Sequence, residues 1–306
     1  MDAVLPLVAR DCERAVILLR SLRRNFAGLR TLWVVVPLAD VDFVRRTLGA
    51  LGGAWQLRVV PEDEVVPELA YTRALRGWYR QQLVKLAIAE LIATTHYLTF
   101  DADVICVRPT TPEALAPDGK GLCHIIQSDA HADWYLGSRA VLGLPREHPR
   151  GLHNVTPAVL SREAVLSLQH HLASRAEAGK YRRGLPGLHQ RWHALRAAWQ
   201  GRLGAPQRTW CTYLIGGAPW TEYALYYSHL EATQQLATHH TLTPHCIYAI
   251  ERSVWRADRH GFDSWDPRPL FDGQGAPYFA IIQSNTRLAP ERVWQKLAPF
   301  LAPHAP

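Results

Sequence analysis

Residues 31–61, "TLWVVVPLADVDFVRRTLGALGGAWQLRVVP", decide the fold of this chain. The apolar run 31–38 predicts a buried strand, and residues 55–61 predict a second one. Between them, residues 39–51 have the apolar spacing of an amphipathic helix, with Asp40 at its start. A strand, a helix and a strand in this order are typical of an α/β protein with a mostly parallel sheet.

The same alternation extends to both sides of this stretch. Upstream, "AVLPLVA" (3–9) predicts a strand and residues 10–26 predict a helix. Downstream, residues 77–94 predict a long helix and "YLTF" (97–100) predicts a fourth strand. We therefore predict a Rossmann-type, mostly parallel sheet with helices on both faces, in a single domain. In such sheets, ligands collect at the carboxyl ends of the strands.

The composition is that of an ordinary globular protein. The chain has 306 residues, 48% hydrophobic and 20% charged, which is enough for a large core without a metal or disulfide. Its five cysteines are scattered and form no CxxC pair, which favours a reducing, cytoplasmic setting over a disulfide framework or a zinc site. No run approaches the roughly 20 apolar residues that span a bilayer, so no transmembrane segment is predicted.

The net charge of +7 predicts an anionic partner, but nucleotides, nucleic acids, acidic glycans and anionic membranes would all satisfy it. Zinc-finger spacing and ribonucleoprotein aromatic motifs are absent from the sequence, so no nucleic-acid partner is predicted. Residues 175–208 are strongly basic and carry Trp192 and Trp199 on one helical face. This basic helical insertion could hold an acidic acceptor, or lie against a membrane surface that displays a lipid-linked one. The alternative is a solvated basic helix that packs its two tryptophans on the body of the protein.

Two aspartates follow the fourth predicted strand directly. Asp101 and Asp103 end the run "HYLTFDADV" (96–104), at the edge where this fold class keeps its ligands. In an extended segment, alternation points both side chains the same way, which suits a shared cation or phosphate. On its own, the pair is equally consistent with solvated acids at a turn.

The helix before these aspartates carries one polar stripe. Trp78, Gln81, Gln82 and Lys85 lie at i, i+3, i+4 and i+7 and so share a face, whereas the rest of the helix is mostly apolar. A lysine there would neutralise a diphosphate, and the amides could bond sugar or ribose hydroxyls. The alternative is a polar stripe that faces solvent.

A third candidate group begins at Thr221. In "WTEYALYY" (220–227), Thr221 predicts a helix cap and places Glu222 in the first turn, where the helix dipole would keep the pKa of its carboxyl low. Such an acid is either a surface residue or a general base aimed into a cleft. Near the C-terminus, "PYFAIIQSN" (277–285) predicts a last strand with a polar end that could complete a metal or nucleotide site.

Three motifs, in this order, resemble those of GT-A glycosyltransferases: "GWYRQQLVKL" (77–86), "YLTFDADVICVRP" (97–109) and "WTEYALYY". The resemblance is strongest to a bacterial group of uncharacterised glycosyltransferase-like proteins. It extends from "LPLVARD" (5–11) to "FAIIQSN" (279–285) and is weakest near residues 180–205. It implies an enzyme that transfers a sugar from a UDP- or GDP-linked donor to a saccharide or envelope-glycan acceptor.

The resemblance also implies roles for the candidate residues. Asp101 and Asp103 would form a DxD motif that binds Mn²⁺ or Mg²⁺, with Asp103 the direct ligand and Asp101 nearer the ribose or sugar. A divalent cation stabilises the charge that gathers on a diphosphate leaving group. The donor would also contact Asp11, Trp78, Gln81, Gln82 and Lys85. Glu222 would deprotonate the acceptor in an inverting enzyme, or hold the sugar or acceptor in a retaining one.

One feature departs from many metal-dependent enzymes of this fold, which take a third ligand from a C-terminal histidine. Here the only histidine after residue 285 is His304, in the terminal tail, so His153, Gln283 or water are the candidate substitutes. Residues 1–109 are predicted to bind the nucleotide sugar and residues 110–306 the acceptor. The protein is predicted to be cytoplasmic, or peripheral at the inner membrane face.

Two other functions are consistent with parts of the sequence. "YLTFDADVI" also resembles the nucleophile strand of haloacid-dehalogenase-type phosphohydrolases, in which Asp101 would attack phosphorus. Here, however, three predicted strands precede the motif, and no acidic pair with a suitably placed lysine follows it. The third possibility is a non-catalytic relative that binds a nucleotide or glycan, which an assay of product formation would distinguish.

Overall fold

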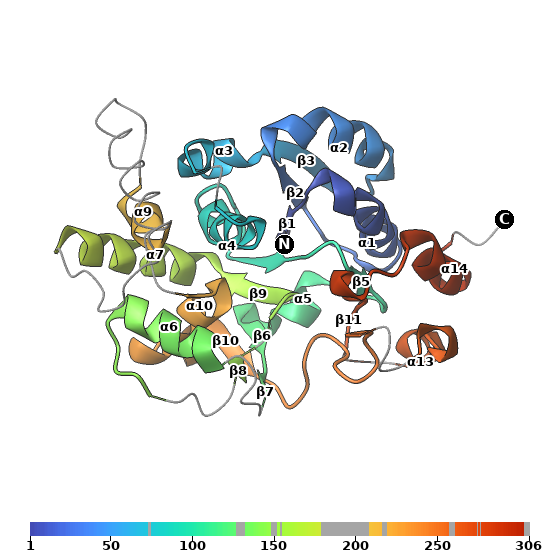
Figure 1. The fold of residues 1–306 in the computed structure, drawn as a ribbon. Helices are drawn as coiled ribbons and strands as arrows, with labels where there is room; N and C mark the ends of the chain where they lie inside the picture. Colours follow the sequence, from blue (N-terminus) through green and yellow to red (C-terminus); the bar gives the residue numbers. More distant parts are fainter. Residues whose placement is uncertain are drawn as a thin grey trace.

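A computed structural model describes residues 1–72, 75–126, 132–147, 152–153, 155–178, 208–215, 219–256, 261–273, 275 and 277–302. Its main sheet has five strands in the order β3-β2-β1-β4-β9 (Figure 1). These strands are β1 (Asp2–Pro6), β2 (Thr31–Val36), β3 (Gln56–Pro61), β4 (His96–Thr99) and β9 (Ala158–Ser161). The first four are parallel and β9 runs antiparallel to β4. The predicted mostly parallel sheet of an α/β fold is confirmed.

Helices cover both faces of this sheet. On one face lie α1 (Cys12–Asn25) and α2 (Val41–Leu48); on the other lie α4 (Gly77–Ala87), α7 (Arg162–Glu177), α9 (Thr209–Ile215) and α10 (Glu222–Ala232) (Figure 1). Alternation along the strands fills two cores, since Ala3 and Leu5 pack with α1 whereas Val4 packs with α4. A strand that is apolar on both faces explains why β1 and β2 are continuous hydrophobic runs.

Shorter elements complete the chain. The helices are α3 (Glu62–Val65), α5 (Pro112–Leu115), α6 (Ala132–Leu142), α11 (Leu236–His239), α13 (Arg268–Phe271) and α14 (Pro290–Leu301). The strands are β5 (Val104–Cys106), β6 (Gly121–Cys123), β7 (Ile125–Ile126), β8 (Leu152–His153), β10 (His240–Leu242) and β11 (Phe279–Ile281). They form the two-stranded pairs β10-β6, β11-β5 and β7-β8.

Strands from late in the chain complete the N-terminal half. β9 extends the main sheet beside β4, and β11 pairs antiparallel with β5, directly after the two aspartates. α14 packs beside α1, on the same side of the molecule (Figure 1). The two halves of the chain are therefore interleaved in one domain, and the assignment of donor and acceptor roles to residues 1–109 and 110–306 stays a prediction.

Local signals in the sequence are mostly confirmed. The Thr221 hydroxyl accepts a 3.2 Å hydrogen bond from the Ala224 amide and so caps α10. The expectation that Asp101 and Asp103 continue an extended strand is wrong: β4 ends at Thr99, and the Asp101 carbonyl accepts a 3.3 Å hydrogen bond from the amide of Val104 in a turn.

The predicted basic insertion at residues 175–208 lies almost entirely outside the described residues, which include only its first four residues and Arg208. Trp192 and Trp199 fall in that gap. Within the described ranges, no helix is long and apolar enough to cross a membrane.

Candidate functional site

Two adjoining cavities lie at the carboxyl ends of β1 and β4. The larger has a volume of about 700 Å³ and the smaller about 240 Å³. They share one wall, which is formed by Trp78, Gln81, Asp101, Asp103, Gln283 and Asn285. Asp11 lines only the smaller cavity, whereas Gln82, Lys85 and Glu222 line only the larger one. The structure thus brings together the stripe from Trp78 to Lys85 with Asp11, the two aspartates and Glu222, which the sequence singled out for donor, metal or acid–base roles.

Lys85 is the centre of the larger cavity's polar wall. It projects from α4, and its Nζ lies 2.9 Å from Asp101 Oδ1, 3.1 Å from Glu222 Oε1 and 2.8 Å from the Thr156 hydroxyl. These three contacts use all three donors of the ammonium group. Within the predicted polar stripe, Gln82 and Lys85 are therefore buried whereas Trp78 is exposed, and the lysine joins the DxD turn to the start of α10.

A second layer of hydrogen bonds holds this arrangement. The Tyr223 hydroxyl lies 2.6 Å from the Thr156 hydroxyl and 2.7 Å from that of Thr99 on β4. The Gln82 side-chain oxygen accepts a 3.1 Å hydrogen bond from the Glu222 amide at the N-terminus of α10. Because each polar group is fixed by another buried group, the positions of Lys85 and Glu222 are set by α4, β4 and α10 together.

Burial and ion pairing compete in this cluster. Burial alone would lower the pKa of Lys85, but the neighbouring Asp101, Tyr223 and Glu222 outweigh it and raise the pKa well above its usual value, so the lysine stays charged. Burial raises the pKa of Glu222 although the Lys85 charge opposes that rise. The expectation that the helix dipole keeps the pKa of Glu222 low is therefore wrong, because the side chain lies inside the protein rather than at its surface.

Asp101 and Asp103 line both cavities from the turn after β4. Asp103 Oδ2 accepts a 2.8 Å hydrogen bond from the amide of Ser284, and burial together with the charge of Asp101 raises the pKa of Asp103 to about 6. Two neighbouring carboxylates that repel each other in this way form a site that a cation would stabilise. Their hard oxygens are suited to Mg²⁺ or Mn²⁺, which are commonly held by one or two carboxylates plus substrate phosphates.

A third protein ligand for a cation at Asp101 and Asp103 would have to come from a neutral side chain. Within the part of the chain that the structure describes, no group of three or more His, Cys, Asp or Glu side chains gathers as metal ligands. The side-chain amides of Gln283 and Asn285 line the same shared wall and offer neutral oxygens. Of the predicted substitutes, the side chain of His153 lies outside what the structure describes, and so does His304.

Several lining residues carry no clear signal in the sequence. Trp134 from α6, Val155, Thr156 and Trp255 line the larger cavity, and Tyr223 contributes to its wall. Trp134 and Trp255 come from stretches after residue 110 where the hydrophobic pattern is irregular. Thr156 follows Asn154 by two residues, in a stretch whose composition indicates only a turn. Tyr223 is the exception and could be found from the sequence, because it follows Glu222 in a conspicuously aromatic helix.

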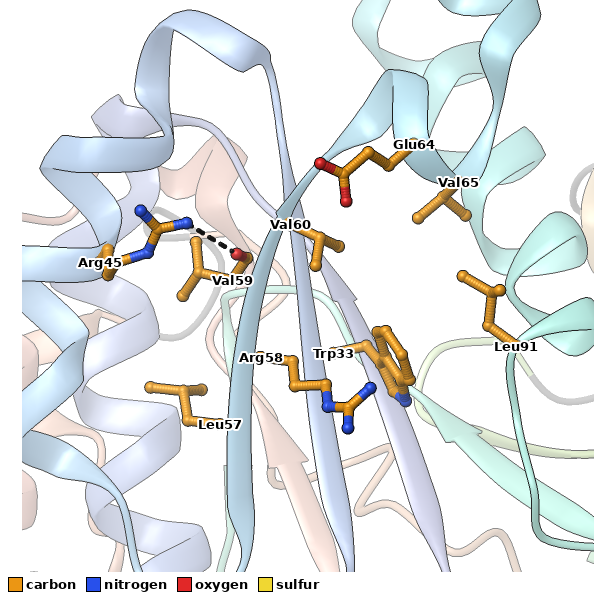
Figure 2. Close-up of a pocket in the computed structure, with 9 residues that line it drawn as sticks. All are labelled: Trp33, Arg45, Leu57, Arg58, Val59, Val60, Glu64, Val65 and Leu91. Carbon is orange, nitrogen blue, oxygen red and sulfur yellow. Dashed lines mark hydrogen bonds between the residues drawn. The ribbon is translucent and has the colours of Figure 1, made fainter.

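A third cavity, of about 660 Å³, lies at the edge strand β3 and shares no residue with the first two. Figure 2 shows Leu57 and Val59 on one side of β3, and Arg58 beside Trp33 on the other. Arg45 donates a 3.3 Å hydrogen bond to the carbonyl of Val59 and so occupies one acceptor of this edge strand, where a charged side chain disfavours pairing with another strand. We therefore assign this cavity to the edge of the sheet rather than to catalysis.

The chain resembles the crystal structure of mouse xyloside xylosyltransferase 1 in its apo form, with a TM-score of 0.47 and 14% identity over 94% of this chain and 100% of that chain. It resembles the galactosyltransferase LgtC in complex with donor and acceptor sugar analogues, with a TM-score of 0.43 and 12% identity over 98% and 96% of the two chains. No curated protein matches the sequence. Residues 1–305 match the profile of DUF6492, so the chain belongs to this family, which is described as a family of unknown function.

Proposed function

We propose that this protein is a glycosyltransferase that moves a sugar from a nucleotide-sugar donor to a saccharide acceptor. One observation carries the proposal: two cavities meet at the Asp101 and Asp103 pair, and Glu222 lines the larger cavity on the far side of Lys85. Transfer between two bound substrates needs such a pair of connected spaces, because the reacting atoms must be held in near-attack geometry.

The smaller cavity suits the nucleotide. It is bordered by Pro6 and Leu7 at the end of β1 and by Asp11 before α1, which is where doubly wound sheets bind nucleotides. In this proposal, Asp11 borders the nucleoside of a UDP- or GDP-linked donor. Trp78 and Gln81 on the shared wall would contact the donor where it enters the larger cavity, toward Gln82.

Asp101 and Asp103 would hold Mn²⁺ or Mg²⁺ against the donor diphosphate. When bound, such a cation neutralises charge on the leaving diphosphate. Asp103 is the better candidate for the direct ligand, because the charge of Asp101 is already paired with Lys85, whereas Asp103 accepts a hydrogen bond from the neutral Ser284 amide. Since its three donors are occupied, Lys85 would contribute to donor binding mainly by fixing Asp101 and by its charge.

Glu222 is the proposed general base of an inverting reaction. Lys85 fixes its Oε1 and opposes the burial that raises its pKa, which keeps the carboxylate available as a proton acceptor. If the reaction retains configuration, the same position would hold the sugar or the acceptor hydroxyl instead. An envelope-glycan or lipid-linked acceptor, reached by a cytoplasmic protein at the inner membrane face, remains part of the proposal and depends on the basic segment 175–208.

The proposal is tested by thermal shift with UDP, GDP and their nucleotide sugars, each with and without Mn²⁺. At a ligand concentration of 100 times Kd, binding should stabilise the native state by about 2.7 kcal/mol. Asp103→Ala should abolish the Mn²⁺-dependent part, whereas Asp272→Ala, which removes an exposed carboxylate from the end of α13, should leave it unchanged. If no nucleotide stabilises the wild-type protein under any metal condition, the donor site is not where we place it.

A second measurement tests the role of Glu222. Glu222→Gln should retain nucleotide binding and lose most sugar transfer, since the amide cannot accept the proton. Unaltered turnover would remove Glu222 from the base role. Phosphate release from simple phosphate monoesters that depends on Asp101 would instead support the phosphohydrolase alternative, and nucleotide binding without any product would support a non-catalytic relative.

A further inference from the structure

We infer that the larger cavity binds a neutral pyranoside against the rings of Trp134 and Trp255. The inference rests on the proposed function and names its acceptor class. Neither tryptophan lines the smaller cavity, so both belong to the acceptor side of the shared wall.

One aromatic wall of the cavity is rigid. Trp78 is part of this wall and is 44% exposed, although it is a large apolar side chain. Its ring centroid lies 5.6 Å from that of Trp134 and 5.0 Å from that of Tyr79. Tyr79 in turn contacts the buried Trp220, with centroids 5.7 Å apart. Because this chain of rings is anchored in the core, the exposed indole surface is held in place before any ligand arrives.

Trp255 forms an aromatic surface elsewhere on the cavity lining. Its indole N–H donates a 2.6 Å hydrogen bond to the carbonyl of Ile250, and its ring contacts Tyr248 edge-on with centroids 6.3 Å apart. Since the N–H is already used, Trp255 can offer a ligand only its ring. A ring that offers no hydrogen bond recognises a flat apolar surface, such as the C–H face of a pyranose.

Polar residues line the same cavity and match the rest of a sugar. Gln81, Gln283 and Asn285 line this cavity on the wall that it shares with the smaller one, and a side-chain amide can both donate to and accept from a hydroxyl group. A few amides among aromatic side chains fit a small polyhydroxylated molecule better than an acyl chain, which would leave these amides without partners.

Charge selects a neutral sugar over an acidic one. The described lining residues include three carboxylates, from Asp101, Asp103 and Glu222, against the cations Lys85 and Arg256. Lys85 is committed to two of those carboxylates, and Arg256 is exposed. A uronate beside Glu222 would therefore meet like charge in a partly enclosed space.

The test uses defined sugars and the native tryptophans as reporters. Methyl β-galactopyranoside, methyl β-glucopyranoside, lactose and cellobiose are titrated into the full chain saturated with the nucleoside diphosphate that stabilises it, and each methyl glycoside is compared with its uronate counterpart. Calorimetry gives Kd, and fluorescence reports the indoles. We expect at least one neutral sugar to bind roughly 10-fold or more tightly than its uronate, which corresponds to about 1.4 kcal/mol.

Variants locate the binding. Trp134→Ala and Trp255→Ala should each weaken sugar binding roughly 10-fold and leave nucleotide binding intact, whereas Trp134→Phe should retain most of it because a flat ring remains. Trp294→Ala is the matched control: Trp294 lies on α14 under Arg20, outside the cavity lining, and its loss should not change the titration.

The possible outcomes separate the inference from the proposed function. If nucleotide binds but no sugar of the panel does, or if Trp134→Ala and Trp255→Ala bind sugar like the wild type, the acceptor inference is wrong and the donor site stands. If a uronate binds more tightly than its neutral counterpart, the charge argument is wrong. If no nucleoside diphosphate binds at all, the proposed function itself fails.

Discussion

Replacing Lys85 by methionine should destabilise the protein strongly. Methionine keeps an unbranched side chain of similar reach but removes the charge. In the native protein, the side chains of Lys85 and Glu222 are only 4% and 6% exposed. Removing one member of a buried ion pair leaves the other charge uncompensated and typically costs about 3–5 kcal/mol. Asp101 adds little to this cost, since its side chain is 41% exposed and can be rehydrated.

The expected cost can be expressed as a melting shift. An unfolding entropy of about 2.1 cal/mol/K per residue gives roughly 0.64 kcal/mol/K for this chain, so Lys85→Met should lower Tm by roughly 5–8 °C. The double variant Lys85→Met, Glu222→Gln should be more stable than Lys85→Met alone, because the unpaired charge is gone. Arg45→Met is the control, since the Arg45 and Asp42 side chains are 57% and 80% exposed, and their pair should contribute no more than about 1 kcal/mol.

The stability of the Lys85→Met variant should depend on pH. In Lys85→Met the attraction that opposes a raised pKa of Glu222 is lost, so the folded pKa rises further above the unfolded value near 4.5. The folded state then binds the proton more tightly, and the variant should regain stability as pH falls from 8 toward 5. Tm by circular dichroism at both pH values tests this. A loss below about 1 kcal/mol, or a double variant no more stable than Lys85→Met, would refute the idea of a buried, mutually dependent ion network.

Three further changes test the neighbouring structure. Asp103→Asn should raise Tm in EDTA at pH 7.5 and less at pH 5. The pKa of Asp103 is raised from 3.8 to about 6, so the cost of its ionisation to folding grows across that range and is complete only above it; equal shifts at both pH values would contradict this. Tyr223→Phe should cost about 1–3 kcal/mol in urea unfolding, since the buried hydroxyls of Thr99 and Thr156 each lose one hydrogen-bond partner. Gly137→Ala should cost about 1–3 kcal/mol, because a Cβ at that position would overlap the carbonyl oxygen of Pro219; a wild-type midpoint would show that α6 can shift.

The first hundred residues are predictable because their signals are local and repeated. Strands such as β2 are apolar on both faces, and the residue spacing in α4 is sufficient to place Gln81, Gln82 and Lys85 on one face of the helix. The Thr221 cap likewise fixes the start of α10 and so the position of Glu222. These features depend on backbone geometry over a few residues, which a sequence encodes directly.

The rest depends on contacts between distant residues. Nothing local to Glu222 indicates that α10 starts inside the protein, so the pKa direction expected from a surface helix is wrong. From the sequence, Lys85 is expected to be free to bind a phosphate, because nothing near it indicates its two carboxylate partners. These partners lie 16 and 137 positions away in the chain. The aromatic lining of the larger cavity is likewise assembled from α4, α6 and a loop near residue 255, which no periodicity connects.

The bond between Asp103 and Ser284 also bears on how the protein is made. The two residues are separated by 181 positions, so at a synthesis rate of about 5–20 residues per second, roughly 10–35 s pass before the second emerges after the first. During that interval β5 lacks its partner strand β11, and the wall shared by the two cavities is incomplete. A nascent chain can therefore form its parallel strands early, yet it becomes competent to hold ligand at the shared wall only after Ser284 has emerged.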